Sequence, residues 1–293
     1  MRRKGFRLVF LFLLCFGPLF PAPASAQSGS LLWEVTGKGL QKPSYLFGTI
    51  HLICPGQFTA DDSLRQALGQ SDRLFLELDM TDPGLTEALM ASMYMKNGTR
   101  LTDLLPEEAY NKTAGYFRDS VGFDIGLLAQ AKPFLLTSIL FNHILDCPIE
   151  SVEGVLAEIA KEKGLYVNGL ESPEEQAAVF DSIPYNVQAK MVVQLIDSIQ
   201  EAKSEFMDLM ALYHRQDIDA IFRYTQKSKF DFEGFEHVVL TDRNKKWLPK
   251  LDYIMQESPT FIAVGAAHLG GKNGLVALLR GFGYQVRPII RPL

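Results

Sequence analysis

The chain has 293 residues, 47% of them hydrophobic and 22% charged, and its formal net charge is −5 at pH 7. This length and composition are sufficient for one large globular domain or two small ones with a proper core. The negative charge argues against a nucleic-acid partner or an anionic membrane surface, since both attract basic proteins.

Residues 1–26 have the pattern of a secretory signal peptide. Four basic residues precede an almost wholly apolar segment over 8–16, and residues 22–26 supply an A-x-A cleavage pattern. The alternative is a retained anchor, but the apolar segment is short for a membrane span, which needs roughly 20 residues. We therefore predict an exported protein, periplasmic or extracellular, without stable membrane insertion. Removing this segment, which holds four of the 29 basic and none of the 34 acidic residues, changes the net charge to −9.

The segment after the signal begins with strands and then becomes helical. Residues 31–36 and 45–50 have β-type composition, and the Gly and Pro residues between them predict a hairpin. A short helix is expected at 63–68 and a third strand at 73–79. Asp82 and Pro83 have the pattern of a helix start. The expected helices then cover residues 83–95, 106–119 and 127–145.

The second half contains more helix and three further strands. Apolar residues at helical spacing predict a helix over 152–160 that ends at Gly164. Ser172 begins a capping box. Asn273 is expected to cap a helix that runs to Arg280. The remaining expected elements are strands at 165–170, 261–264 and 284–289, and helices at 186–213, 217–227 and 234–256. About six strands and eight or nine helices predict an α/β fold: a single domain, residues 27–293, with a mixed β-sheet and large helical insertions.

Two cysteines, Cys54 and Cys147, remain after removal of the signal. An even number of cysteines in an oxidising compartment favours a disulfide. The alternatives are two buried free thiols, or a role for Cys54 as a nucleophile or ligand near His51.

The tetrapeptide Gly-x-x-His occurs twice, ending at His51 and at His268, each time after an apolar, β-rich segment. We expect each glycine to let the backbone turn and each histidine to lie just past the end of a strand. Because open α/β sheets bind ligands at their strand ends, the two imidazoles could meet in one site. Imidazole is also the commonest metal ligand in proteins.

Glu77 is the third candidate, because it lies among apolar residues of the expected strand 73–79. A buried carboxylate needs a charge partner, which a metal ion or an arginine could supply. Two histidines and one carboxylate form a familiar hydrolytic metal site. Alternatively, each histidine is a solvated residue at a strand end, and Glu77 pairs with Arg243 or lies on an edge strand. His143, His214 and His237 lie in helical segments and are expected to be structural or exposed.

Other catalytic signatures are absent from the sequence. There is no G-x-S-x-G nucleophile turn, no H-E-x-x-H zinc helix and no glycine-rich phosphate loop. The glycines of residues 270–274 resemble an anion-binding turn, but we favour a tight connection between a strand and a helix.

Several ordered motifs resemble the TraB/GumN family. They are YLFGTIHL at 45–52, LELD at 76–79, GLE at 169–171 with EQ at 175–176, DRN at 242–244, and VGAAHLG at 264–270. The resemblance covers residues 31–289. This family is similar to the TIKI metalloproteases and more distantly to erythromycin esterase and ChaN-like proteins.

The resemblance implies a divalent-metal site for hydrolysis, formed by His51, Glu77 and His268, with zinc, manganese or cobalt as the ion. Arg243 and Asn244 would lie beside it and polarise a substrate carbonyl or stabilise the oxyanion. Glu171 is a further candidate for the same cleft. The second motif departs from the family pattern, because Ala267 stands where a glycine is common.

Two hypotheses follow from the sequence. The first is an exported, metal-dependent hydrolase that acts on a peptide or a small molecule, most plausibly at a peptide bond, with Glu77 as a ligand or as the proton acceptor. The second is a non-catalytic exported protein that binds a ligand or partner on the same scaffold. The substrate, the metal and the oligomeric state are left open.

Overall fold

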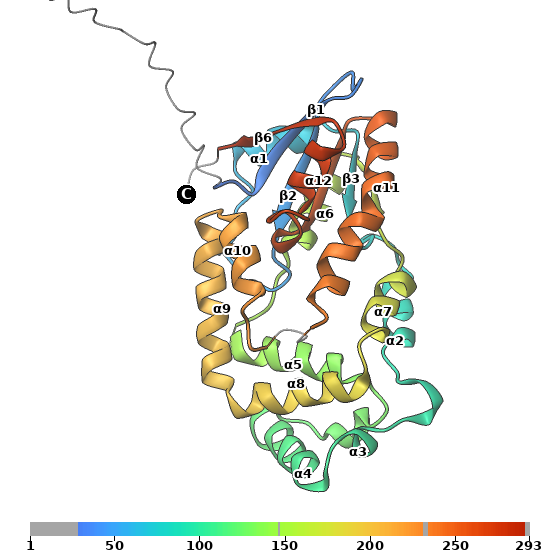
Figure 1. Ribbon diagram of the computed structural model, residues 1–293, viewed down its shortest axis with the longest axis vertical. Coiled ribbons are helices and arrows are strands. Elements are labelled where there is room, and N and C mark those ends of the chain that lie inside the picture. The colour runs from blue at the N-terminus through green and yellow to red at the C-terminus, as the bar shows by residue number, and fades with distance from the viewer. Residues whose placement is uncertain (1–28, 146, 231–233, 291–293) are drawn as a thin grey trace, which may run out of the picture.

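The computed structural model describes residues 29–145, 147–230 and 234–290. The expected signal peptide, residues 1–26, lies outside the described residues. Figure 1 shows an elongated molecule with a β-sheet at one end, helices at the other, and α9 and α11 running between them.

A six-stranded mixed sheet forms the core, with strand order β4-β3-β5-β2-β1-β6. The strands are β1 (Leu32–Gly37), β2 (Ser44–Thr49), β3 (Arg73–Leu76), β4 (Tyr166–Gly169), β5 (Thr260–Gly265) and β6 (Tyr284–Ile289). The neighbours β4, β3, β5 and β2 are parallel, whereas β1 is antiparallel to both β2 and β6. The expected hairpin and the expected α/β class with a mixed sheet are confirmed.

The burial of each strand agrees with its position in the sheet. All of β2 and nearly all of β5 are buried, as expected for parallel strands that are covered on both faces. In the edge strand β6, buried Tyr284 and Val286 alternate with exposed Gln285 and Arg287, so one face meets solvent.

The helices form two groups. The helices that pack in the core of the sheet are α1 (Asp62–Gly69), α6 (Val152–Glu162), α10 (Ile218–Thr225), α11 (Arg243–Glu257) and α12 (Leu275–Gly281). The last turns of α9, with Met210, Leu212 and Tyr213, also reach this core. The others are α2 (Leu85–Ser92), α3 (Leu101–Leu104), α4 (Glu107–Tyr116), α5 (Pro133–Leu145), α7 (Pro173–Asp181), α8 (Tyr185–Asp197) and α9 (Ile199–His214). Part of this second group encloses a separate apolar cluster that includes Leu101, Phe117, Leu140 and Leu195. The large helical insertions between β3 and β4 and between β4 and β5 are therefore confirmed.

Twelve α-helices occur in the described residues, against eight or nine expected, because several expected helices are interrupted. The helix expected over 186–213 breaks at Ser198 (φ −129°, ψ 35°), and α8 and α9 run in different directions in Figure 1. The expected helix 127–145 is a short 3-10 turn, Ile125–Leu128, followed by α5. A π turn, His237–Asp242, precedes α11.

Two expected helix caps are wrong. Asp82 accepts the Gly84 N–H in a turn, and the N-cap of α2 is Gly84. The N-cap of α12 is Gly274 instead of Asn273, whose backbone carbonyl accepts a hydrogen bond from Asn244 Nδ2 (2.9 Å). In contrast, the Ser172 capping box and the turn at Gly164 (φ +68°) form as expected.

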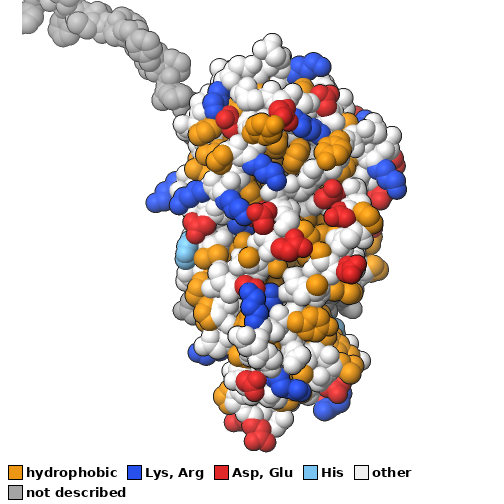
Figure 2. All heavy atoms as spheres, turned by 90° about the vertical axis from the view of Figure 1, so that its right-hand side faces the viewer, with side chains coloured by type: hydrophobic (Ala, Val, Ile, Leu, Met, Phe, Trp, Pro, Cys, Tyr) orange, Lys and Arg blue, Asp and Glu red, His pale blue; other side chains and the backbone are white. Residues whose placement is uncertain are grey.

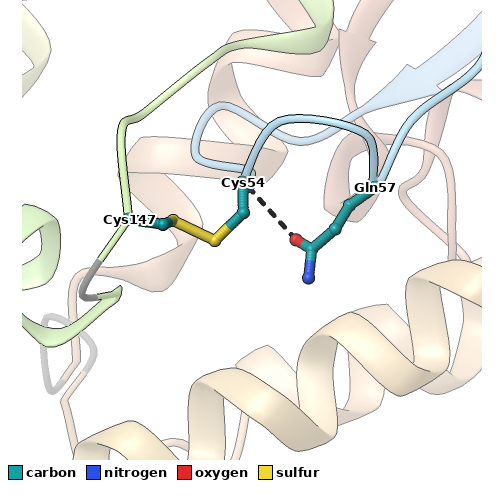
Figure 3. Close-up of a disulfide and its surroundings, with 3 residues drawn as sticks. All are labelled: Cys54, Gln57 and Cys147. Carbon is teal, nitrogen blue, oxygen red and sulfur yellow. Dashed lines mark hydrogen bonds between the residues drawn. A yellow bond between two sulfur atoms is a disulfide. The ribbon is translucent and has the colours of Figure 1, made fainter.

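The expected disulfide between Cys54 and Cys147 is present (Figure 3). It links the loop after β2 to the segment before α6, and the backbones of Ile53 and Glu150 exchange two hydrogen bonds (3.0 and 2.9 Å) beside it. The Cys54 N–H donates to Gln57 Oε1 (3.1 Å). Because both sulfurs are bonded, Cys54 is neither a nucleophile nor a ligand in this state.

The part of the chain that the structure describes contains no helix long and apolar enough to cross a membrane. Figure 2 shows the face over α11, α7 and α2, where acidic, basic and apolar side chains are interspersed. No continuous basic surface is visible on this face.

The glycines of residues 270–274 allow close packing. A Cβ atom on Gly270 would lie 2.3 Å from the carbonyl oxygen of Ile218, and one on Gly274 would lie 2.1 Å from the carbonyl oxygen of Gly270. These contacts support the interpretation as a tight connection.

We therefore expect Gly270→Ala to lower the free energy of unfolding by about 1–3 kcal/mol, because backbone atoms must move to make room for the methyl group. The matched control is Gly281→Ala at the end of α12, where a Cβ meets no atom within 4 Å. This control should be neutral or stabilise by about 0.4–1 kcal/mol. Urea unfolding of both variants measures the difference, and equal effects would contradict the packing argument.

Candidate functional site

Each of the four parallel strands delivers one titratable side chain to the same edge of the sheet. His51 follows β2, Glu77 follows β3, Glu171 follows β4 and His268 follows β5. Because parallel strands have their carboxyl ends at one edge, these residues meet although they are far apart in the sequence. Glu77 lies one residue past the end of β3 (Arg73–Leu76), whereas the expected strand, 73–79, included it.

The two histidines face the same carboxylate oxygen. Glu77 Oε1 lies 4.0 Å from His51 Nε2 and 3.8 Å from His268 Nε2. The same oxygen accepts a hydrogen bond from the Gly265 N–H (2.9 Å). The structure therefore brings together all three residues that the sequence singled out.

The glycines of the two Gly-x-x-His motifs supply room. Neither has a positive φ, so the expectation that they turn the backbone is wrong. A Cβ on Gly48 would lie 3.1 Å from Ala266, which places β2 tightly against the second motif. A Cβ on Gly265 would lie 3.4 Å from Glu77 Oε1 and 3.6 Å from His51 Nε2, with the ring of His268 at 3.7 Å. Gly265 thus leaves open the space between the three side chains.

Arg243, the first residue of α11, is the charge partner of two buried carboxylates. Its Nη2 donates to Glu77 Oε2 (2.5 Å) and to Glu171 Oε2 (2.9 Å), and its Nε lies 3.2 Å from both oxygens of Glu171. The three side chains are at most 8% exposed. The ring of Trp247 also lies 4.6 Å from the guanidinium carbon, which adds a cation–π contact. Of the partners considered for Glu77, the arginine is the one observed.

Arg243 keeps Glu77 ionised. Burial raises the pKa of this carboxyl, but the charge of Arg243, together with the two histidines and the hydrogen bond from the Gly265 N–H, outweighs burial and holds the pKa below its usual range. Glu77 is therefore a carboxylate over the physiological pH range.

The hydrogen bonds of Asn244 assign the tautomer of His268. Asn244 Nδ2 donates to two backbone carbonyls, those of His268 (3.0 Å) and Asn273 (2.9 Å), so Oδ1 faces His268 Nδ1 and accepts a hydrogen bond from the Nδ1–H (2.7 Å). Burial lowers the pKa of His268 to about 3, so the ring is neutral and Nε2 carries a lone pair. That lone pair faces Arg243 Nη1 at 3.2 Å.

Asn244 therefore positions His268. Both of its amide hydrogens are used by backbone carbonyls, so a donor role toward a substrate oxygen would require it to break one of these bonds.

A residue that the sequence did not single out, Glu153, orients His51. Its Oε1 accepts hydrogen bonds from His51 Nδ1 (2.7 Å) and from the hydroxyl of Thr49. The negative charge of Glu153 raises the pKa of His51 to about 9, against the opposing effect of burial. Glu153 is buried on α6, on the same helix face as Leu156 and Ala160. The sequence signal that could have identified Glu153 is an acidic residue on the apolar face of a helix.

The two imidazoles are thus held in the same way. Each uses Nδ1–H to bind an oxygen acceptor and turns Nε2 toward Glu77, the arrangement that fixes metal-binding histidines in proteins. The other histidines, His143, His214 and His237, are exposed, as expected.

Within the described ranges, no group of three or more His, Cys, Asp or Glu side chains is arranged so that it could hold a metal ion. The Nε2–Oε1 distances of 3.8 and 4.0 Å exceed the roughly 3.3 Å expected between ligands of a tetrahedral zinc ion. Arg243 also occupies one oxygen of Glu77 and contacts His268 Nε2.

The site opens into a cavity of about 310 Å³. Helices of the insertions supply most of its wall, which is largely apolar. The lining includes Phe134, Phe180, Leu209, Tyr213, Val239 and Leu240, together with His51, Arg243 and His268. A mostly apolar pocket with a few converging polar groups is typical of a ligand site.

Comparison with known proteins defines the class of this chain. Residues 31–288 match the family model described as the TraB/PrgY/gumN family, and the chain belongs to that family. No solved structure matches it at a significant level.

Among curated proteins, the chain is similar to metalloproteases named TIKI. It is 24% identical to metalloprotease TIKI2 of Danio rerio, covering 88% of this chain and 60% of the relative. It is 22% identical to metalloprotease TIKI1 of Homo sapiens, covering 92% of this chain and 64% of the relative. The chain therefore spans less than two thirds of the length of these relatives.

We expect Arg243→Met to lower the free energy of unfolding by about 3–5 kcal/mol, because it leaves two buried carboxylates without a cation. The matched control is Lys245→Met on the same helix, where the exposed side chain pairs with Asp242 only at 3.8 Å. Denaturant unfolding of both variants tests this expectation. A loss for Arg243→Met no larger than for the control would show that the carboxylates do not depend on the arginine.

Proposed function

We propose that this protein is an exported, metal-dependent hydrolase that cleaves peptide bonds, with a divalent ion held by His51, Glu77 and His268. One observation carries the proposal: two oriented imidazole Nε2 atoms and one carboxylate oxygen face the same open space beside Gly265. The metalloprotease names of the relatives support the reaction class. The pattern of residues 1–26 supports export.

The donor set fits such an ion. Two imidazoles and one carboxylate match the protein ligands of catalytic zinc sites, and manganese and cobalt accept the same groups. The local charge also favours a cation, because two buried carboxylates, Glu77 and Glu171, share the single guanidinium of Arg243. A modest approach of the three side chains, with Arg243 Nη1 leaving His268 and His51 Nε2 releasing its proton, would complete the site.

When bound, the ion would supply a water of lowered pKa and polarise the substrate carbonyl. The residues around it have separate tasks. Asn244 and Glu153 hold the two imidazoles with Nε2 facing inward. Glu77 would ligate the ion or act as the base for the attacking water. Arg243 fixes Glu77 and, once Nη1 leaves His268, can donate to a substrate carbonyl oxygen.

One observation favours the second candidate, a non-catalytic binding protein. Arg243 already pairs with Glu77, so this carboxylate has a charge partner without a metal ion, and the adjoining cavity is apolar. A bound peptide or small molecule could occupy this cavity without being cleaved.

Metal content separates the two candidates. Wild-type protein loaded with zinc, manganese or cobalt and then desalted should retain about one ion per chain by mass spectrometry. The double variant His51→Ala, His268→Ala should retain none, because two of three ligands are missing. The control is His143→Ala, His214→Ala, which removes two exposed histidines and should bind like wild type. Equal retention by both double variants, or no retention by wild type, would contradict the metal site.

The open space beside Gly265 provides a second test. Gly265→Ala should keep the fold, because its backbone angles (φ −49°, ψ 134°) suit alanine and the nearest atoms are 3.4 Å or more from the new methyl group. We expect metal affinity and peptide hydrolysis to fall at least about 10-fold, since the methyl stands between the three ligands. Calorimetric metal titration measures the affinity. Unchanged affinity would place the ion elsewhere.

A further inference from the structure

A second apolar pocket adjoins the cavity of the site. Its volume is about 260 Å³. Five of its lining residues also line the site cavity: Leu209, Thr225, Val239, Leu240 and Ala267. The rest of the wall comes mainly from aromatic side chains of α5, α9 and α10 and the segment after α10, namely Phe141, Phe206, Tyr224 and Phe230. The two spaces therefore adjoin and share part of their lining.

The polar side chains of this second pocket are already paired. The Ser228 hydroxyl donates to Glu205 Oε2 (2.7 Å), and the Tyr224 hydroxyl donates to Asp208 Oδ2 (3.0 Å). The Thr225 hydroxyl donates to the backbone carbonyl of Phe222 (2.9 Å). Because each hydroxyl proton is already donated, an acceptor group of a ligand would lose its water without gaining one of these protons. An acidic ligand would in addition meet the carboxylate of Glu205.

The junction of the two pockets lies next to the proposed metal ligands. Ala267, which lines both spaces, directly precedes His268. The sequence has alanine here where a glycine is common in the resembling family, so this chain adds a methyl group to the shared wall. A group in the second pocket would therefore lie against the residue that precedes His268.

We propose that the second pocket is a specificity subsite that receives a large apolar side chain, aromatic or long aliphatic, of a peptide substrate near the bond that is cleaved. The inference rests on the proposed hydrolase function, which supplies the peptide and the site of cleavage. The volume supports a side chain as the occupant, because it lies below the roughly 300–1,000 Å³ of pockets that hold a whole small molecule. The apolar walls decide the kind of side chain.

Binding of short peptides tests the subsite independently of turnover. The probes are N-acetylated hexapeptide amides of alanine with one Phe, Leu, Ser, Asp or Lys placed at each position in turn. Titration calorimetry with the mature protein in EDTA measures affinity without cleavage. At one position, Phe and Leu should bind about 10- to 100-fold more tightly than Ser, because an apolar side chain leaves water. Asp should bind most weakly.

Two neighbouring residues of α9 form a matched pair of variants. Phe206 lines the pocket, whereas Met207 is 58% exposed and does not line it. Phe206→Ser should reduce the preference for Phe over Ser to less than about 3-fold, and Met207→Ser should leave it unchanged. Phe141→Ser changes the part of the wall that α5 supplies and should act like Phe206→Ser, so a second variant is available if one fails to fold by circular dichroism.

The outcomes separate the subsite from the hydrolase. Equal affinity of wild type for all peptides, preference for Lys, or an apolar preference that survives both wall variants would overturn the subsite. Cleavage of the peptides by metal-loaded protein without preference for Phe or Leu would overturn it and leave the hydrolase intact. Apolar preference in binding, lost in the wall variants, with no cleavage under any metal would refute the hydrolase and retain the pocket as a selective binding site.

Discussion

The structure depends most on the pairing of Arg243 with Glu77 and Glu171. Two carboxylates at the ends of adjacent parallel strands could not remain buried and ionised without a cation between them. The guanidinium supplies that charge from the first turn of α11 and thereby fixes the start of this helix against β3 and β4. Trp247, one turn later, packs against both Arg243 and His268 and extends the same contact toward β5. One arginine therefore sets the relative positions of three strand ends and a helix.

Each histidine of the site is held by a further residue beside this arginine–carboxylate cluster. His268 is neutral because it is buried, and Asn244 fixes its tautomer through three hydrogen bonds. His51 is open to the cavity, with a side chain 61% exposed, yet Glu153 and the disulfide-linked loop restrict its position. The site thus combines a buried histidine, His268, with an exposed one, His51. The helical insertions close the space above it with apolar walls, which directs any ligand toward His51 and Gly265.

Sequence reasoning found most of the residues of the site but not the way in which they are held. The Gly-x-x-His pattern and the acidic residue within an apolar segment are local signals, so His51, Glu77 and His268 could be singled out. Glu153 was missed because its role depends on a contact between α6 and the loop after β2, more than one hundred residues earlier. The break at Ser198 was missed because helical periodicity continues through it; the direction of α9 is decided by packing between the insertion and the sheet. Gly48 and Gly265 were expected to let the backbone turn, but they are needed because other atoms lie close to them. The sequence does not show this, since those atoms come from distant parts of the chain.

By itself, the sequence determined the α/β class, the hairpin and the residue types available for chemistry, and it favoured a disulfide between the two remaining cysteines. These follow from hydrophobic periodicity, turn residues and the count of two remaining cysteines, all of which act locally or leave a single pairing. The tertiary structure alone decided that four strand ends meet at one edge, that an arginine divides its charge between two carboxylates, and which ring nitrogen of each histidine faces Glu77. Each of these depends on strand order and on distances of a few ångströms between distant segments, and neither composition nor spacing along the chain encodes such distances.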